Sequence, residues 1–256
     1  MNYLILTEGE KTEKNILREV LKRYDFNVVD SPKVNSYSDI EIDIETISND
    51  KENIVIAQAP KNRLSELLKL YNEKNYDLDK VFGNRANYFA GIFLVFDVDH
   101  TSIEDLKNMF DIHNDETEKG LLLVSSPCIE IMADYGRTSE IRVNHLSDYK
   151  KEINKHINDE LRFGKNVEQY IIDNFEELAI KYLDQNVEEF NSYNVMEHPQ
   201  LVIDKINETN IRSNEEVIYR YFTTVVYVAM AYICRLVKID NNYNIIREYL
   251  LNRNEN

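Results

Sequence analysis

The feature that most constrains the fold of this chain is a set of short apolar runs separated by segments with helical spacing. The strongest run is AGIFLVF at residues 90–96, which has no polar side chain and is typical of a strand buried on both faces of a sheet. Shorter runs at 3–7, 53–57 and 120–125 are also predicted to be strands. Buried strands that alternate with helices predict an α/β fold with a mostly parallel sheet flanked by helices.

Several further elements are predicted around these strands. Residues 11–24 have apolar side chains at helical spacing, with Lys and Arg on the opposite side. A second helix is predicted to start after Ser102, with Asp105 at the position that completes a capping box. A third helix is expected after Pro60, and the alternating residues 39–47 predict a half-exposed strand.

The pattern changes in the second half of the chain. Residues 166–190, 213–237 and 243–252 are predicted to be helical, with no clear strand among them. Three roles stay open for this helical half: forming a homo-oligomer, binding a partner protein, or clamping a substrate. The predicted parts are an α/β domain at 1–145, an insert within it at about 31–90, and a helical region at 146–256.

Composition limits where the chain works and what it binds. The two cysteines, Cys128 and Cys234, lie far apart, and the N-terminus does not resemble a signal peptide, so we expect a reducing cytoplasm. The longest apolar run, 221–234, is shorter than a bilayer requires and predicts a buried helix rather than a membrane span. The net charge of −16 argues against broad, non-specific binding to nucleic acid, but not against an enzyme that reaches phosphates through bound cations.

Acidic residues follow two of the predicted strands. Glu8 comes directly after the first strand, and Asp97 and Asp99 come directly after the strongest one. In an open α/β sheet the ligand site lies beyond the carboxyl ends of the strands, so these carboxylates converge if the two strands are neighbours. Each signal alone has a plainer explanation, a helix N-terminal charge for Glu8 and a surface loop for the Asp pair. Together they favour a Mg²⁺ site, because three close carboxylates repel one another without a cation.

Three segments resemble a known family. Residues 7–13, TEGEKTE, resemble the E-G-x-x-[TS]-E turn of Toprim domains, and residues 96–99, FDVD, resemble their D-x-D strand end. Residues 125–130, SSPCIE, resemble the S-x-P-C-x-E segment of the RloB-like group, which is related to the OLD-family Toprim nucleases. The resemblance covers roughly residues 1–145.

This resemblance implies a Toprim-like (Rossmannoid) fold and a Mg²⁺-dependent or Mn²⁺-dependent nuclease that hydrolyses DNA or RNA. It implies that Asp97 and Asp99 are metal ligands and that Glu8 is an acid/base or a metal ligand. Glu13 and Glu130 are implied as ligands of a second ion. The family also implies a separate ATPase partner and a role in prokaryotic defence against phage. The chain has no G-x-x-x-x-G-K-[ST] loop and is therefore not itself that ATPase.

Three basic features near the motifs are candidates for substrate contact. Lys11 is placed to meet a phosphate at the helix N-terminus, and the alternative is an exposed surface lysine. His100 follows the D-x-D directly and is a candidate for substrate contact or proton transfer, although a solvated loop histidine is the simpler reading. The basic stretch at 150–155 either contacts a nucleic-acid backbone or forms a solvated helix face.

Two rival interpretations use the same residues. Asp97 and Asp99 also fit the first motif of haloacid-dehalogenase-like phosphatases, as nucleophile and general acid, with Ser125 or Ser126 supplying the second motif. Against this, about ninety residues precede the motif, no paired-Asp motif follows, and the TEGEKTE turn stays unexplained. The other rival is a catalytically inactive Toprim domain that serves as a binding subunit, which the acidic composition favours and the intact carboxylate set opposes.

Overall fold

A computed structural model gives the fold of the chain. The structure describes residues 1–9, 11–31, 48, 50–58, 89–98, 101–115, 120–126, 128–136, 142–143, 146–160, 164, 166–185, 203–204, 212–213, 216–218, 222–223 and 243–254. The chain divides into two compact units, each considered by itself. Unit 1 contains Met1–Phe96 and Ser102–Leu123, and unit 2 contains Asp97–Thr101 and Val124–Asn256.

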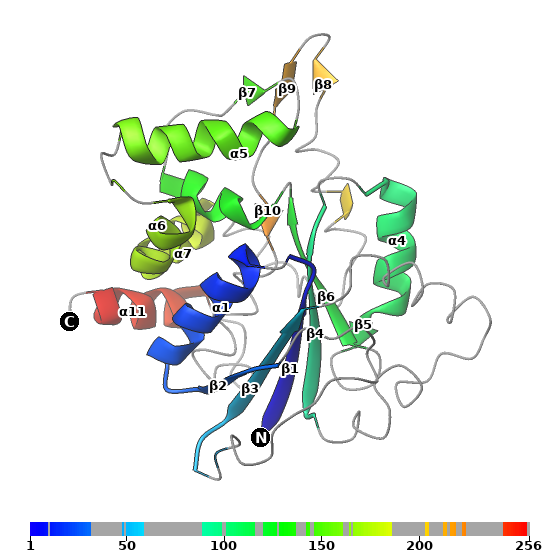
Figure 1. Cartoon of the computed structure of the whole chain (residues 1–256), viewed down its shortest axis with the longest axis vertical. Helices are drawn as coiled ribbons and strands as arrows, with labels where there is room; N and C mark the ends of the chain where they lie inside the picture. The colour runs from blue at the N-terminus through cyan, green and yellow to red at the C-terminus, as the bar shows by residue number, and fades with distance from the viewer. Residues whose placement is uncertain are drawn as a thin grey trace. The chain divides into compact units, whose positions relative to one another are not determined.

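The main sheet has the strand order β10-β6-β4-β1-β3-β2, and β5 pairs with β6 (Figure 1). Its five strands from β6 to β2 are parallel, whereas β5 and β10 pair with β6 in the antiparallel direction. This confirms the predicted α/β class with a mostly parallel sheet flanked by helices, an arrangement consistent with a Rossmann-like fold. The strands are β1 (Asn2–Thr7), β2 (Asn27–Asp30), β3 (Asn53–Gln58), β4 (Gly91–Asp97), β5 (Asn114–Asp115), β6 (Gly120–Ser126) and β10 (Phe222–Thr223).

Burial explains why the apolar runs became strands. Every residue of β3, β4 and β6 is buried, as predicted from their near-continuous apolar sequences. The first strand, β1, lies between β3 and β4, with Leu4 opposite both Val55 and Ile92. At the carboxyl end of β1, Thr7 is opposite Val95, and the Glu8 N–H donates to the Val95 carbonyl at 3.1 Å. The two strands that precede the acidic motifs are therefore neighbours, as the sequence argument required.

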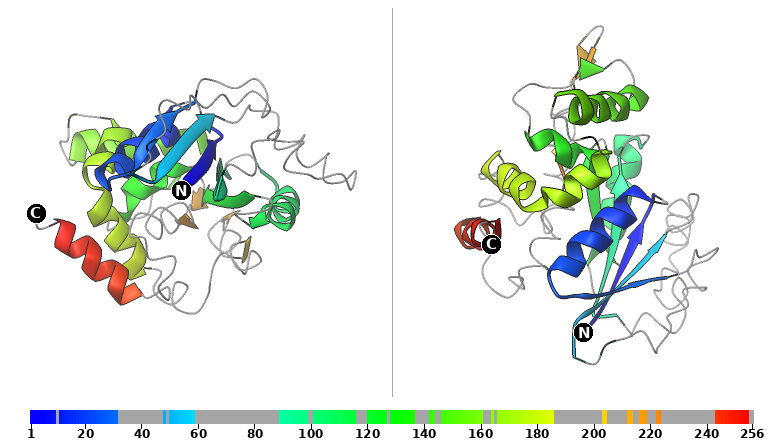
Figure 2. Two further views of the ribbon diagram at one scale, coloured as in Figure 1. Left: turned by 90° about the horizontal axis from the view of Figure 1, so that it is seen from below. Right: turned by 60° about the vertical axis from the view of Figure 1, so that its left-hand side comes forward.

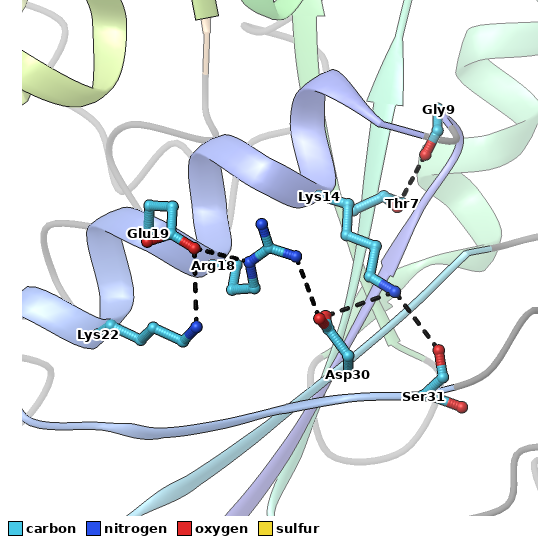
Figure 3. Close-up of polar contacts among 8 residues, drawn as sticks. All are labelled: Thr7, Gly9, Lys14, Arg18, Glu19, Lys22, Asp30 and Ser31. Atoms are coloured by element: carbon cyan, nitrogen blue, oxygen red, sulfur yellow. Dashed lines mark hydrogen bonds and ion pairs between the residues drawn. The ribbon is translucent and has the colours of Figure 1, made fainter. Parts of the chain in front are cut away.

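Helix α1 (Thr12–Arg23) packs its apolar side against β2 and β3 (Figures 1 and 2). Polar side chains also connect it to the end of β2 (Figure 3). Asp30 lies 3.4 Å from Lys14 Nζ and 3.1 Å from Arg18 Nη1, and Lys14 Nζ also donates to the Ser31 carbonyl at 3.4 Å. Arg18 Nε donates to Glu19 at 2.8 Å, and this hydrogen bond lowers the pKa of the Glu19 carboxyl. The contacts of Lys14 and Arg18 therefore connect the middle of α1 to the end of β2.

Helix α4 (Ile103–Ile112) starts where the capping signal predicted. The Ser102 side chain accepts a hydrogen bond from the Asp105 N–H at 3.1 Å, which satisfies one of the donors exposed at a helix start. The Asp105 carboxylate returns to the same side chain, accepting from the Ser102 hydroxyl at 2.6 Å. The Ser102–Asp105 pair therefore defines where α4 begins, a few residues after β4.

Unit 2 contains most of the remaining helices and a small antiparallel sheet. The 3₁₀ helix η4 packs against α5, α6, α7 and β10, and α11 lies beside α7 (Figure 2). The small sheet has the order β7-β9-β8. Its elements are β7 (Arg142–Val143), β8 (Arg212–Ser213), β9 (Glu216–Ile218), η4 (Ile129–Gly136), α5 (Leu146–Lys155), a π-helical turn η5 (His156–Glu160), α6 (Val167–Asp173), α7 (Phe175–Gln185) and α11 (Tyr243–Asn254).

Two secondary-structure predictions differ from the structure. The helix predicted over 213–237 is wrong at its described residues, which form the end of β8 together with β9 and β10. The segment is rich in Val, Ile, Tyr and Thr, and a short apolar run of that kind does not distinguish a strand from a helix by periodicity. Strand β2 was missed because it has only four residues. It begins just after the tight turn at Asp25, whose φ is 68°.

Other predictions are left open. The strand predicted at 39–47 and the helix after Pro60 lie outside the described residues. The helical character of 146–256 as a whole stays a prediction, although α5, α6, α7 and α11 lie within it. Within the part of the chain that the structure describes, no helix combines the length and apolar character needed to cross a membrane.

Candidate metal site

Asp97 is the last residue of β4 and is held in a fixed position. Its side chain is buried, and its Oδ1 accepts a hydrogen bond from the Ile129 N–H at 3.0 Å. Ile129 is the first residue of η4, so the carboxylate satisfies a donor at the start of that helix. A carboxylate that accepts a buried backbone N–H has a defined position before any ligand binds.

Two further ligand-type side chains lie next to Asp97. One ligand atom from each of Asp97, Cys128 and Glu130 can be chosen so that all three lie within 4.8 Å of one another. All three residues are buried, with exposed fractions of 8%, 0% and 6%. The structure therefore brings together two carboxylates and a thiol, which is a donor set able to hold a divalent cation.

One lysine lies beside the two carboxylates of this cluster. The Lys150 Nζ on α5 lies 3.5 Å from Glu130 Oε2 and 3.9 Å from Asp97 Oδ2, and the lysine side chain is 42% exposed. Two carboxylates therefore face one ammonium among these three side chains. Glu130 Oε2 is buried and accepts no hydrogen bond from any described residue. A buried, incompletely satisfied carboxylate oxygen is costly, and a bound cation would supply the missing partner.

Cys128 is neutral in the metal-free protein. Burial raises the pKa of its thiol well above the ordinary value, and the charges of Glu130 and Asp97 raise that pKa further, while Lys150 lowers it. The thiol therefore keeps its proton at neutral pH. Mg²⁺ prefers oxygen ligands and leaves such a sulfur unbound, so the residues that fit this ion are Asp97 and Glu130.

A buried hydrogen bond connects the two elements that carry Glu130 and Lys150. The Tyr149 hydroxyl of α5 donates to Asp134 Oδ2 of η4 at 3.0 Å, and both side chains are fully buried. Tyr149 is adjacent to Lys150 in the sequence, and Asp134 lies one helical turn beyond Glu130. This bond sets the position of the Lys150 backbone relative to η4, and with it the reach of the ammonium toward the carboxylates.

The TEGEKTE turn forms a second acidic feature, within unit 1. Glu13 lies in the first turn of α1 and is 4% exposed. Its carboxylate lies against Gly9, where a Cβ added to the glycine would come within 1.7 Å of Glu13 Oε2. The Thr7 hydroxyl donates to the Gly9 carbonyl at 3.2 Å (Figure 3). The Glu13 carboxylate therefore occupies the space that a side chain at position 9 would take, while Glu8 beside it is partly exposed.

The predicted site residues are distributed as follows. Asp97 and Glu130 lie together, whereas Glu8 and Glu13 belong to unit 1 and are described there. Lys11 is exposed and is the N-cap residue of α1, where its side chain makes no capping hydrogen bond. Asp99 and His100 lie outside the described residues.

Cys128 and Lys150 were missed as parts of a metal cluster. The SSPCIE motif contains both Cys128 and Glu130, but the motif resemblance implies a ligand role only for Glu130. Lys150 was seen only as the start of a basic stretch, and its position beside two carboxylates depends on how α5 packs against η4.

No protein-family model, curated protein or solved structure matches the chain. The Toprim and RloB-like resemblance stays a prediction from the sequence motifs.

Proposed function

We propose that this chain is a divalent-cation-dependent phosphodiester hydrolase that acts on nucleic acid, with Mg²⁺ or Mn²⁺ held by Asp97 and Glu130. The observation that carries the proposal is the pair of buried carboxylates at the carboxyl end of β4, opposed by one partly exposed ammonium. The motifs TEGEKTE, FDVD and SSPCIE support the same activity by their resemblance to Toprim nucleases.

The proposed mechanism assigns a task to each residue. A bound divalent ion offsets charge on the scissile phosphate and lowers the pKa of an attacking water. Asp97, whose Oδ1 accepts the Ile129 N–H, and Glu130 would hold that ion. Lys150 contributes positive charge beside it, where a phosphate oxygen would gain an ion pair. The resemblance to Toprim nucleases implies that Glu8 transfers a proton or binds the metal ion. It implies that Asp99 binds the metal ion.

The proposal extends to substrates and partners. Glu13 is a candidate ligand of a second ion, with the Gly9 turn beside it. Because the chain has a net charge of −16, we expect it to prefer a small structured RNA or a substrate delivered by a partner over long duplex DNA. A separate ATPase partner and a role in defence against phage follow from the resemblance, and a homo-oligomer formed through the helical half belongs to the same proposal.

A cleavage assay tests the proposed activity. Wild-type protein, Asp97→Asn and the control Asp111→Asn are incubated with end-labelled single-stranded DNA, duplex DNA and RNA, in Mg²⁺, Mn²⁺ or a chelator. Asp111 is an exposed residue of α4 that is not a member of the cluster, so its substitution removes the same charge without removing a proposed ligand. We expect cleavage by wild type and Asp111→Asn only with metal, and a loss of more than roughly 100-fold in Asp97→Asn.

Two results would contradict the proposal. Cleavage that persists in the chelator would exclude metal dependence, and equal rates for Asp97→Asn and wild type would exclude the Asp97 site. If wild type binds metal but cleaves none of the substrates, the binding-subunit interpretation, which the acidic composition favours, takes its place.

A further inference from the structure

We propose that the Asp97–Cys128–Glu130 cluster is also a site for a thiophilic divalent cation of the Zn²⁺ class, with the Cys128 sulfur as its third ligand. This inference rests on the carboxylates of the proposed function but does not require that the protein cleaves nucleic acid. It gives the buried thiol a role that Mg²⁺ chemistry does not use.

The spacing of the three ligand atoms is close to what such an ion requires. Ligands at roughly 2.0–2.3 Å from a tetrahedral ion lie roughly 3.3–3.5 Å from one another. The atoms of Asp97, Cys128 and Glu130 already lie within 4.8 Å of one another without an ion. Asp97 accepts a hydrogen bond from the Ile129 N–H, and Ile129 stands between Cys128 and Glu130 in the sequence, so the Asp97 carboxylate is tied to the segment that carries the other two ligands.

A second observation concerns the surroundings of Glu130. Glu130 is 94% buried, since its exposed fraction is 6%, and its Oε2 accepts no hydrogen bond from any described residue. Its ion pair with the Lys150 Nζ, at 3.5 Å, comes from a side chain that is 42% exposed. A cation bound between the carboxylates and the sulfur would give this oxygen a direct ligand bond.

The donor set selects the ion. Two carboxylate oxygens alone suit Mg²⁺ or Mn²⁺, whereas oxygen ligands together with a thiolate favour Zn²⁺ and Cd²⁺ over Mg²⁺. On binding, the Cys128 S–H bond is replaced by a sulfur–metal bond and the thiol proton passes to the buffer, with no change of oxidation state. Three protein ligands leave a fourth position for water or a phosphate oxygen. Zn²⁺ should therefore displace Mg²⁺ from the same two carboxylates.

Absorption spectroscopy with Cd²⁺ tests the inference on the full chain. A cadmium–thiolate bond gives a ligand-to-metal charge-transfer band in the ultraviolet, which carboxylate ligation does not give. The titrated proteins are wild type, Cys234→Ser, Cys128→Ser and Glu130→Gln, each checked for folding by circular dichroism. Cys234→Ser is the matched control, because it removes the other thiol of the chain.

We expect a band that saturates at one equivalent in wild type and Cys234→Ser. We expect no band in Cys128→Ser, and Cd²⁺ affinity weakened by more than roughly tenfold in Glu130→Gln, whose thiol is intact. A folded Cys234→Ser protein without the band would overturn the inference, whether or not Cys128→Ser folds. A band with no Mg²⁺-dependent cleavage would refute the proposed hydrolase and leave the thiolate site standing. Cleavage without the band would refute the thiolate site and leave the proposed hydrolase standing.

Discussion

The two roles of Asp97 can be separated by two substitutions. In the structure Oδ1 accepts the Ile129 N–H at 3.0 Å, while Oδ2 faces Lys150 at 3.9 Å. Asp97→Asn keeps a carbonyl oxygen that can accept the same N–H but removes the negative charge. Asp97→Ala removes both. The proposed site therefore predicts that both variants lose metal binding, but that only the alanine variant loses much stability without metal.

The expected change in the free energy of unfolding follows from the buried hydrogen bond between Asp97 and the Ile129 N–H. A hydrogen bond to a charged group contributes about 1.5–3 kcal/mol, and removing the acceptor leaves a buried N–H unsatisfied. We expect Asp97→Ala to lower the metal-free free energy of unfolding by about 1.5–3 kcal/mol, a Tm decrease of about 3–12 °C for a chain of this length. We expect Asp97→Asn to change it by less than about 1 kcal/mol, because the hydrogen bond persists and the repulsion with Glu130 is relieved.

The assay is a thermal melt of wild type and both variants in a chelator, and then in Mg²⁺ or Mn²⁺. An ion that binds only the folded protein raises Tm by mass action, so only wild type should gain stability with metal. Two results would refute the reasoning. Asparagine and alanine variants of equal metal-free stability would show that the Ile129 hydrogen bond contributes little. A metal-induced Tm increase in the asparagine variant equal to that of wild type would show that the charge of Asp97 does not bind the ion.

Four further predictions follow from single contacts. Gly9→Ala places a Cβ 1.7 Å from the Glu13 carboxylate and should lower the free energy of unfolding by about 1–3 kcal/mol, measured by denaturant titration. Lys150→Met removes the competing ammonium, so calorimetry should show Mg²⁺ binding tightened by up to roughly tenfold, while the metal-free protein should lose stability because two buried carboxylates lose a cationic partner. Ser102→Ala removes the α4 cap and should cost about 0.5–2 kcal/mol by thermal melt, with Mg²⁺ binding unchanged. Cys128, buried and with a raised pKa, should resist iodoacetamide in the folded protein and react after denaturation, as followed by mass spectrometry.

The central strands were predictable because their sequences are almost wholly apolar and too short for a typical helix. A run such as GIFLVFD, of seven residues, favours a strand buried on both faces, and the structure buries all of β4. The start of α4 was predictable for a local reason, since Ser102 and the Asp105 N–H lie three residues apart. By contrast, β9 and β10 depend on partners distant in sequence, Val143 and Ser125 among them, and no local pattern specifies such pairing.

The candidate site was predictable only in part. Asp97 could be identified because the carboxyl end of a buried strand is where α/β sheets place their ligands. Glu130 followed from a motif resemblance rather than from physical reasoning. Cys128 and Lys150 required tertiary structure, because η4 and α5 must pack together before the ammonium comes within 3.5 Å of Glu130.

The measurement that tests the central claim most directly is a calorimetric Mn²⁺ titration of wild type, Asp97→Asn and Asp111→Asn. Mn²⁺ accepts the same oxygen ligands as Mg²⁺. If Asp97 and Glu130 hold a divalent cation, wild type and Asp111→Asn bind it with equal affinity, and Asp97→Asn binds it more weakly by more than roughly tenfold. Equal binding by all three proteins, or no binding by wild type, would contradict the account.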